Sequence, residues 1–365
     1  MENVENILNR EILQKEDIIS LLSLKDKREI KLLLDKGYEI KKRFVGNKVY
    51  YRGLIEYSNL CAKDCNYCGI RVSNKNYNRY TMEDREVVEA ATKAYNYGYG
   101  SIVLQSGERS DNSFVKRVES LLKKIKNIGN GKLGITLSVG EQSEEVYRRF
   151  FDAGAHRFLL RIETTNRELY SKIHPKNQTF ENRLKSLELL KKIGYQTGTG
   201  VMIGLPNQTI EDLAEDLIFF REFDIDMVGM GPFIEAENTP MYINTKNKDM
   251  LPKIERFNLT LRMIAVLRIM MKDINIASST ALQTLVPDGR EQGLRSGSNV
   301  IMPNLTPFRY RENYKLYDKK PSIDEENKEY RDSLDERVKS VGDTIGYNEW
   351  GDSPHFKKKK RKTIE

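Results

Sequence analysis

The stretch GYGSIVLQ, residues 98–105, shows the unit from which the fold of this chain is built. Its first glycine ends a helical stretch at residues 87–97, and a short apolar run follows at residues 101–105. Glycine suits the position after a helix because it has no Cβ and readily adopts the left-handed conformation. A continuous apolar run is typical of a strand buried on both faces. The same unit recurs, with apolar runs at residues 134–139, 157–162 and 197–204.

Further apolar runs extend this pattern less regularly, at residues 51–57, 227–234, 276–280 and 299–303. Strands that alternate with helices predict a parallel sheet. Eight such strands over about 250 residues match the size of a (β/α)8 barrel. We therefore expect an α/β fold of the TIM-barrel type. An open, doubly wound sheet is the alternative, because periodicity does not show whether a sheet closes.

The pattern divides the chain into three segments. Residues 1–48 are expected to form an N-terminal helical segment, residues 49–306 the barrel, and residues 307–365 an irregular C-terminal extension with a basic tail. In the first segment, the leucines expected to be buried are Leu21, Leu22, Leu32, Leu33 and Leu34.

The net charge of +8 is concentrated at one end of the chain. Residues 357–362 are all Lys or Arg, which favours a solvated, mobile tail rather than a nucleic-acid site. The sequence has no apolar run of about 18 residues, so we expect no membrane partner. The N-terminal residues are polar and mixed in charge, unlike a targeting signal, and the expected location is cytoplasmic.

The three cysteines of the chain, Cys61, Cys65 and Cys68, all lie just after the first expected strand. The carboxyl ends of barrel strands carry the active site. Three thiolates on one loop can hold three irons of a [4Fe–4S] cluster and leave the fourth iron open. A passive electron-transfer cluster and a Cys₃His zinc site are alternatives, the latter with a fourth ligand taken from His156, His174 or His355.

The spacing C-x₃-C-x₂-C, with Tyr67 just before the last cysteine, resembles the signature of radical S-adenosylmethionine (SAM) enzymes. The resemblance implies one [4Fe–4S] cluster whose open iron binds SAM through its amino and carboxylate groups. It further implies that the reduced cluster cleaves SAM to methionine and a 5′-deoxyadenosyl radical.

The same resemblance implies cofactor contacts at several strand ends. Ser106, Gly107 and Glu108 follow the second expected strand, where members of the superfamily bind the methionyl amino group. Glu163 resembles the carboxylate that holds the ribose hydroxyls, and Arg183 the arginine that faces the methionyl carboxylate. The remaining cofactor-binding positions are Tyr67, Ser138, Gly200 and Gly204.

Between residues 52 and 317 the chain resembles more narrowly the HydE family of [FeFe]-hydrogenase maturases. The stretches that carry this resemblance are YCGIR (67–71), VLQSGE (103–108), RIETT (161–165), FENR (180–183), GLPNQT (204–209), MGPF (230–233) and NVIMP (299–303). The resemblance implies a radical enzyme that acts on a small iron carbonyl–cyanide–cysteinate during assembly of the diiron subsite of the H-cluster. It also implies the partner maturases HydG and HydF, and an electron donor such as ferredoxin or flavodoxin.

By position in this family, six residues are expected at the substrate end of the barrel: Arg52, Gln105, Ser279, Thr280, Tyr314 and Tyr317. The two tyrosines could instead pack the C-terminal extension. Some family members carry a second, [2Fe–2S] cluster on cysteines beyond the barrel. Residues 318–337 of this chain contain no cysteine, so we expect a single cluster.

Other functions remain open on sequence alone. A lysine mutase resembling methylornithine synthase would share most cofactor motifs. A biotin-synthase-like sulfur inserter fits less well, because it needs cysteines that are missing here. A non-catalytic iron–sulfur carrier would not need the set of Glu108, Glu163 and Arg183.

Overall fold

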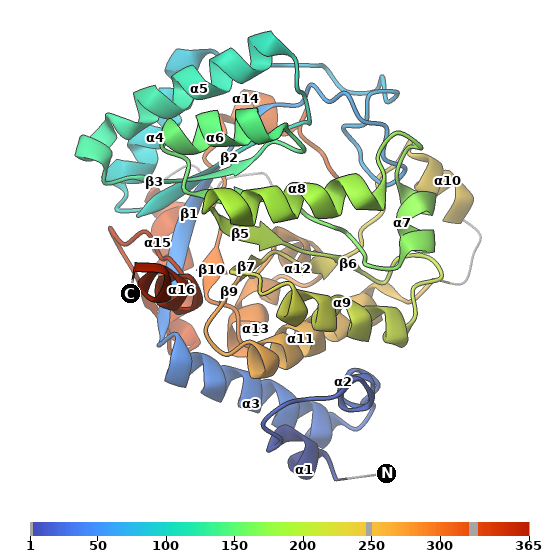
Figure 1. Ribbon diagram of the computed structural model, residues 1–365. Helices are drawn as coiled ribbons and strands as arrows, with labels where there is room; N and C mark the ends of the chain where they lie inside the picture. Colours follow the sequence, from blue (N-terminus) through green and yellow to red (C-terminus); the bar gives the residue numbers. More distant parts are fainter. Residues whose placement is uncertain (1–2, 246–249, 321–327, 365) are drawn as a thin grey trace.

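The computed structural model describes residues 3–245, 250–320 and 328–364, and its centre is a parallel sheet (Figure 1). The strand order is β10-β1-β2-β3-β4-β5-β7-β9. A bridge between Ala277, just after β9, and Val300 of β10 joins the two ends of this order, so the sheet closes. The expected barrel is confirmed and the open sheet is excluded. The strands are β1 (Lys48–Ser58), β2 (Ser101–Ser106), β3 (Gly134–Ser138), β4 (Arg157–Leu159), β5 (Gln196–Thr199), β7 (Met227–Val228), β9 (Asn275–Ile276) and β10 (Val300–Ile301).

Two of the expected strands are interrupted. The run at residues 197–204 is divided between β5 and β6 (Met202–Ile203), and the run at residues 227–234 between β7 and β8 (Gly231–Pro232). β6 and β8 pair with each other as a separate small sheet. At the break, a Cβ on Gly200 would lie 2.0 Å from the carbonyl oxygen of Gly229, so only glycine allows the two segments to approach this closely.

Helices surround the barrel (Figure 1). Side chains alternate along each strand, so one set faces these helices and the other faces the barrel interior. Ile55, Ile102, Ile135 and Phe158 belong to the buried outer core. Within the described residues, no helix is both long and apolar enough to cross a membrane. The main surrounding helices are α4 (Asp84–Asn96), α5 (Asn112–Lys126), α6 (Glu144–Asp152), α8 (Phe180–Ile193), α9 (Ile210–Glu222), α11 (Lys253–Met270), α12 (Thr280–Leu285) and α13 (Gly289–Arg295).

The N-terminal segment forms α1 (Val4–Leu8), α2 (Lys15–Leu22) and α3 (Lys27–Phe44), which lie against α9 and α11 below the barrel in Figure 1. Leu21, Leu22 and Leu33 are buried, as expected. The expectation for Leu32 is wrong, since this side chain is 41% exposed, and Leu34 is half-buried. Successive helical residues point in directions about 100° apart, so three adjacent leucines cannot all face the same neighbour.

The C-terminal extension is more regular than expected. It contains α14 (Phe308–Arg311), α15 (Lys328–Ser340), β11 (Thr344–Ile345) and α16 (Pro354–Ile364). β11 pairs in parallel with the start of β1. The tail is not simply solvated, because Lys358 forms an ion pair with Asp273 (2.6 Å) and Lys359 with Asp226 (2.5 Å).

Part of this extension, residues 349–356, closes the amino end of the barrel; we call it the C-terminal plug. The first residues of three strands bond to it. Arg157 of β4 donates Nε–H to Asp352 Oδ1 (3.0 Å) and Gln196 of β5 donates to the Ser353 hydroxyl (3.1 Å). Asn275 of β9 donates to the Gly351 carbonyl (2.7 Å). The chain itself therefore fills the amino end, and the carboxyl end is left for ligands.

Candidate active site

The three cysteines lie at the carboxyl end of the barrel, on the loop after β1 that we call the cysteine loop (residues 59–74). Backbone hydrogen bonds join this loop to three distant segments, with Ala62 donating to Glu108 (2.8 Å), Asn66 to Ile173 (2.9 Å) and Gly69 to Leu316 (3.0 Å). The loop is thus held by the β2 end, by α7 (Arg167–Ile173) and by the C-terminal extension.

All three thiols are free; Cys65 is buried, and Cys61 and Cys68 are half-buried. Burial raises the pKa of the Cys65 thiol to about 12 and also raises the pKa of Cys61 and Cys68. Neutral thiols are what low-polarity surroundings favour, and a bound metal cation reverses this preference. Three free thiols on one constrained loop, with no disulfide between them, fit a three-cysteine iron–sulfur cluster.

None of the three histidines is placed to complete a zinc site with these thiols. His156 and His355 lie at the amino end of the barrel, where they pair with Asp352 (3.3 Å) and with Asp224 (2.6 Å). His174 is close to the cysteine loop, but its Nδ1 bonds to the Tyr170 carbonyl oxygen (3.0 Å) and its Nε2 to Tyr67 Oη (3.4 Å). The Cys₃His alternative therefore has no free histidine ligand among the described residues.

Arg183, at the start of α8, reaches back toward the cysteine loop. Its Nε donates to Glu141 Oε1 (2.6 Å), Nη1 donates to the Arg161 carbonyl, and Nη2 lies 4.0 Å from Glu108 Oε2. Lys63 of the cysteine loop pairs with the other Glu108 oxygen (3.2 Å). Burial raises the pKa of Glu108, while Arg183 acts in the opposite direction. The expected pair of Glu108 and Arg183 is thus brought together beside the cysteines, with Glu141 as a partner that sequence reasoning missed.

Glu163 follows β4 in a conformation that side chains rarely adopt, with φ of +67°. Its N–H donates to the Gly200 carbonyl and its own carbonyl accepts from Met202, both at 2.9 Å. Arg161 Nη2 lies 2.9 Å from Glu163 Oε2 in an ion pair. Neither Arg161 Nη2 nor Glu163 Oε2 has a hydrogen-bond partner among the described residues. Strained residues with unused polar atoms are typical of ligand sites.

Ser106 and Gly107 place the end of β2 directly against the cysteine loop. A Cβ on Gly107 would lie 2.4 Å from the Leu60 carbonyl oxygen and 2.7 Å from Cys61 Cβ, so glycine is required for this approach. The Ser106 hydroxyl donates to the Gly107 carbonyl (2.7 Å), and Ser138 lies beside Gln105 at the end of β3.

An apolar surface lies next to Glu163, whose carbonyl accepts from the N–H of Met202. Met202, Leu205 and Phe233 form a small buried cluster against which Tyr67 packs. Gly204 lies between Met202 and Leu205 of this cluster in the sequence and has φ of +83°. Such a surface suits a flat heterocycle, with backbone groups of the Gly200–Gly204 stretch at its edge.

Three of the expected substrate residues, Gln105, Ser279 and Thr280, lie at the carboxyl end of the barrel. Gln105 is the penultimate residue of β2, and Ser279 precedes α12 with a buried hydroxyl that has no hydrogen-bond partner among the described residues. Thr280 Oγ1 accepts from Arg290 Nη2 (2.9 Å).

Tyr314 and Tyr317 lie on a segment of the extension that crosses this end, residues 313–320, which we call the strap. Tyr314 is buried and Tyr317 is half-buried, and burial raises the pKa of both phenols. Lys320 of the strap forms a buried ion pair with Glu56 of β1, a pair that sequence reasoning missed. The strap also bonds through Asp318 N–H to the Glu235 carbonyl (3.0 Å), so it covers the carboxyl end from β1 to β8.

Arg52 is not at the substrate end, and that expectation is wrong. It is paired with Ser101, the first residue of β2, and its Nη2 donates to the Gly351 carbonyl of the C-terminal plug (3.3 Å). Arg52 shares its face of β1 with Glu56 but precedes it by four residues, about 13 Å along a strand. The family resemblance predicted the substrate end for Arg52, whereas the strand register places it near the amino end.

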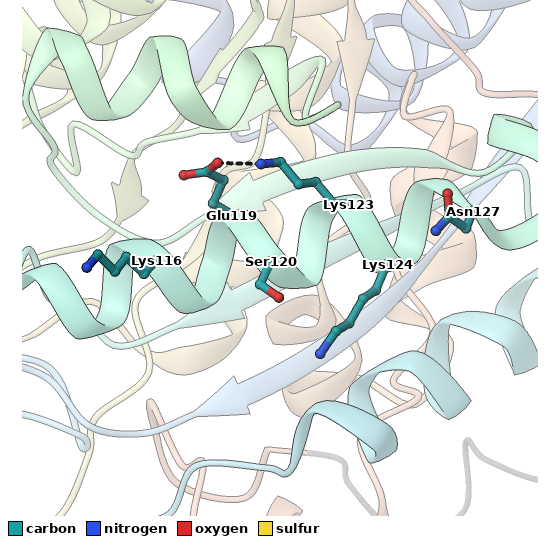
Figure 2. A pocket seen from close by; sticks show the side chains of 6 residues that line it. All are labelled: Lys116, Glu119, Ser120, Lys123, Lys124 and Asn127. Carbon is teal, nitrogen blue, oxygen red and sulfur yellow. Dashed lines mark hydrogen bonds and ion pairs between the residues drawn. The ribbon is translucent and has the colours of Figure 1, made fainter.

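Two surface depressions lie outside the barrel. One, of about 700 Å³, adjoins the cysteine loop and is lined partly by Ala62, Lys63 and Glu108. The other, of about 390 Å³, lies on the exposed face of α5 (Figure 2). Two of its three lysines are paired, Lys123 with Glu119 (2.6 Å) and Lys124 with Asp84 (2.7 Å), and none of the expected site residues lines it.

The closed parallel barrel, the three-cysteine loop after β1 and the acidic and basic residues at neighbouring strand ends define a radical SAM enzyme. In agreement, the sequence profile of the Radical SAM superfamily matches residues 55–220. The chain is 44% identical, over 351 residues and 96% of both chains, to the [FeFe] hydrogenase maturase subunit HydE of Thermotoga maritima. This chain belongs to the HydE family. Membership implies a [4Fe–4S] cluster and SAM as cofactors.

More distant relatives share the fold. The chain is 26% identical to 3-methylornithine synthase of Methanosarcina acetivorans, covering 93% of this chain and 92% of the relative. The crystal structure of methylornithine synthase (PylB) superposes with a TM-score of 0.78 at 24% identity, covering 94% of this chain and 97% of that one. The maturase HydG of Carboxydothermus hydrogenoformans superposes with a TM-score of 0.77 at 18% identity, covering 94% and 79%. At these identities the two structures support the barrel and no particular substrate.

Proposed function

We propose that this chain cleaves SAM reductively and uses the radical in building the diiron subsite of [FeFe]-hydrogenase. The observation that carries the proposal is the convergence of Cys61, Cys65 and Cys68 with Glu163 and Arg183 at one barrel end. The 44% identity to HydE over nearly the whole chain supports the maturation role. The chemistry that the cofactors supply when bound is the cleavage of SAM to methionine and a 5′-deoxyadenosyl radical.

The residues of this chain would divide the work as follows. Cys61, Cys65 and Cys68 hold one cluster, the only one for which the sequence has cysteines. Arg183 is held by Glu141 through Nε and by the Arg161 carbonyl through Nη1, so Nη2 is the nitrogen placed to pair with a carboxylate. Glu163 offers a carboxylate that forms an ion pair with Arg161, and its Oε2 has no hydrogen-bond partner among the described residues, so it could accept from vicinal hydroxyls.

The remaining cofactor contacts are assigned by position. Ser106, Gly107 and Glu108 would hold the amino group of SAM, and Ser138 lies on the neighbouring strand. Tyr67 and the stretch from Gly200 to Gly204 border the adenine.

The substrate we propose is a small iron carbonyl–cyanide–cysteinate, as the family implies. Gln105, Ser279 and Thr280 offer polar groups at the barrel mouth, and Tyr314 and Tyr317 on the strap exclude water above them. A site of this kind needs few polar groups to orient a ligand. The partners we propose are HydG as the source of the substrate, HydF as the acceptor of the product, and a ferredoxin or flavodoxin as electron donor.

The deciding experiment measures 5′-deoxyadenosine released by anaerobically reconstituted protein with dithionite, with and without the iron cyanide–carbonyl–cysteinate. Strong stimulation by this compound is the expected result. Release that is stimulated by lysine instead would assign a methylornithine-synthase-like mutase. Cluster-loaded protein that releases none would be an iron–sulfur carrier.

A further inference from the structure

A buried glutamine lies behind the cysteine loop, outside every group of residues assigned above. Gln178 belongs to the turn between α7 and α8, and its N–H donates to the Pro175 carbonyl (2.8 Å). Its side chain is directed inward and the residue is only 4% exposed. The amide lies against Cys65, whose thiol donates to Gln178 Oε1 at 3.4 Å.

The three sulfurs differ in their hydrogen-bond surroundings. Cys61 Sγ accepts from the backbone N–H groups of Lys63 (3.4 Å) and Glu108 (3.3 Å), and Cys68 from the backbone of Ile70. Cys65 is bordered instead by the side chains of Gln178 and Tyr67. A side-chain partner can be removed by mutation without changing the loop backbone, whereas a backbone donor cannot.

Loss of the Cys65 proton reverses the direction of this hydrogen bond. A metal-bound cysteine is a thiolate, which accepts hydrogen bonds and donates none. A carboxamide has its oxygen and its NH₂ group on the same planar end, so a half-turn about its last torsion exchanges them in place. Cys65 and Gln178 are both buried, so the amide N–H of Gln178 is available to donate to this thiolate. A hydrogen bond to an ionised acceptor is stronger than one to a neutral acceptor.

We propose that Gln178 donates a hydrogen bond to the Cys65 sulfur in the cluster-loaded protein and thereby raises the reduction potential of the cluster. Reduction adds one negative charge, which is shared by the ligand sulfurs. A donor aimed at one sulfur stabilises the reduced form more than the oxidised form. Gln178 is therefore a positioning and tuning residue, and this role rests on the proposed cluster at Cys61, Cys65 and Cys68.

The test compares Gln178→Met and Gln178→Glu with wild type in reconstituted full-length protein. Both replacements approximate the length of glutamine, and neither ionised Glu nor Met donates a hydrogen bond. The measurement is the midpoint potential of the cluster, followed by electron paramagnetic resonance during a reductive titration without SAM. We expect the ratio of reduced to oxidised cluster at a fixed potential to fall about tenfold in Gln178→Met, equivalent to about 59 mV for one electron. The fall should be larger in Gln178→Glu, which adds a negative charge.

Gln142→Met is the matched control. Gln142 is also a buried glutamine, but its amide donates to the Arg109 (2.7 Å) and Val139 (3.3 Å) carbonyls and not to a cysteine. The midpoint potential of the cluster in Gln142→Met should equal that of wild type. Unchanged midpoints in both Gln178 variants, or an equal shift in Gln142→Met, would overturn the role of Gln178. Failure of wild-type protein to assemble any [4Fe–4S] cluster would instead overturn the proposed function.

Discussion

The two ends of the barrel are built on different principles. At the amino end, the C-terminal plug bonds to the buried side chains of Arg52 and Arg157, and Asp352 lies between Arg157 and His156. At the carboxyl end lie the cysteine loop and Glu163, which has a left-handed backbone. Both ends contain buried polar atoms without hydrogen-bond partners among the described residues. The ends differ because the chain itself fills the amino end, whereas the carboxyl end carries the cysteines. Stability and function should therefore respond to mutation at opposite ends.

The largest effect is expected from Cys65→Ala at the carboxyl end. Removing one of three thiolate ligands should prevent stable cluster assembly and reduce SAM cleavage by a factor of at least about 10³. Iron content, the visible spectrum and 5′-deoxyadenosine release measure this. The apoprotein should unfold at the same temperature as wild-type apoprotein. An active, iron-loaded Cys65→Ala protein would refute the assignment.

At the amino end, Asp352→Ala should destabilise the fold. The carboxylate lies 2.7 Å from Arg157 Nη2, and removing it leaves a fully buried guanidinium without its anion. Breaking such a pair costs about 3 kcal/mol or more. Thermal unfolding of the apoprotein should show a clearly lower midpoint. The cysteines lie at the other end, so SAM affinity of the loaded protein should match wild type at temperatures where both are folded; a loss of affinity would show that the ends are coupled.

Glu163→Gly should separate stability from function at a single residue. Glycine relieves the left-handed strain, so apoprotein stability should rise by about 1 kcal/mol. The lost carboxylate should weaken SAM binding about tenfold, which corresponds to about 1.4 kcal/mol. Calorimetric titration of SAM and thermal unfolding give the two values. Normal SAM affinity would retire the cofactor role of Glu163, and reduced stability would show that the strain is compensated elsewhere. A matched control is Asn207→Gly, another non-glycine residue with positive φ (+63°).

The smallest effect is a pH dependence at the amino end. A hydrogen bond to Asp273, opposed by burial and aided by Asp224, raises the pKa of His355 above its ordinary value of 6.5. Lys358 pairs with Asp273, and Lys359 pairs with Asp224, within the same group of charges. Because the pKa of His355 is raised in the folded protein, protonation of this residue stabilises the fold. This contribution to stability is complete below pH 6.5 and is lost as the pH rises through the folded-state pKa.

The measurement is the difference in thermal midpoint between wild type and His355→Gln from pH 5 to 9. The difference should be largest at pH 5 and smaller at pH 9. Taking the difference is necessary because burial lowers the pKa of His156 and of His174 to about 3, which gives the opposite slope below pH 6.5. A difference that is constant over this range would show that His355 does not titrate in the folded protein.

The sequence was most informative where function and position are local. The cysteine loop, Ser106–Glu108 and Glu163 each follow a strand directly, so the barrel prediction places them at the carboxyl end without further knowledge. It was least informative for partners from distant segments. Glu141, Lys320 and Gln178 lie outside every recognised motif, and each acquires its role only from what it contacts.

The sequence by itself determined the repeated strand–helix unit, the family and the three-cysteine motif, because periodicity and spacing are properties of neighbouring residues. Only the tertiary structure decided the depth of Arg52, the closure of the amino end by the C-terminal plug, and the amide beside Cys65. These depend on strand register and on contacts between residues 76 to 299 positions apart, which no local pattern encodes.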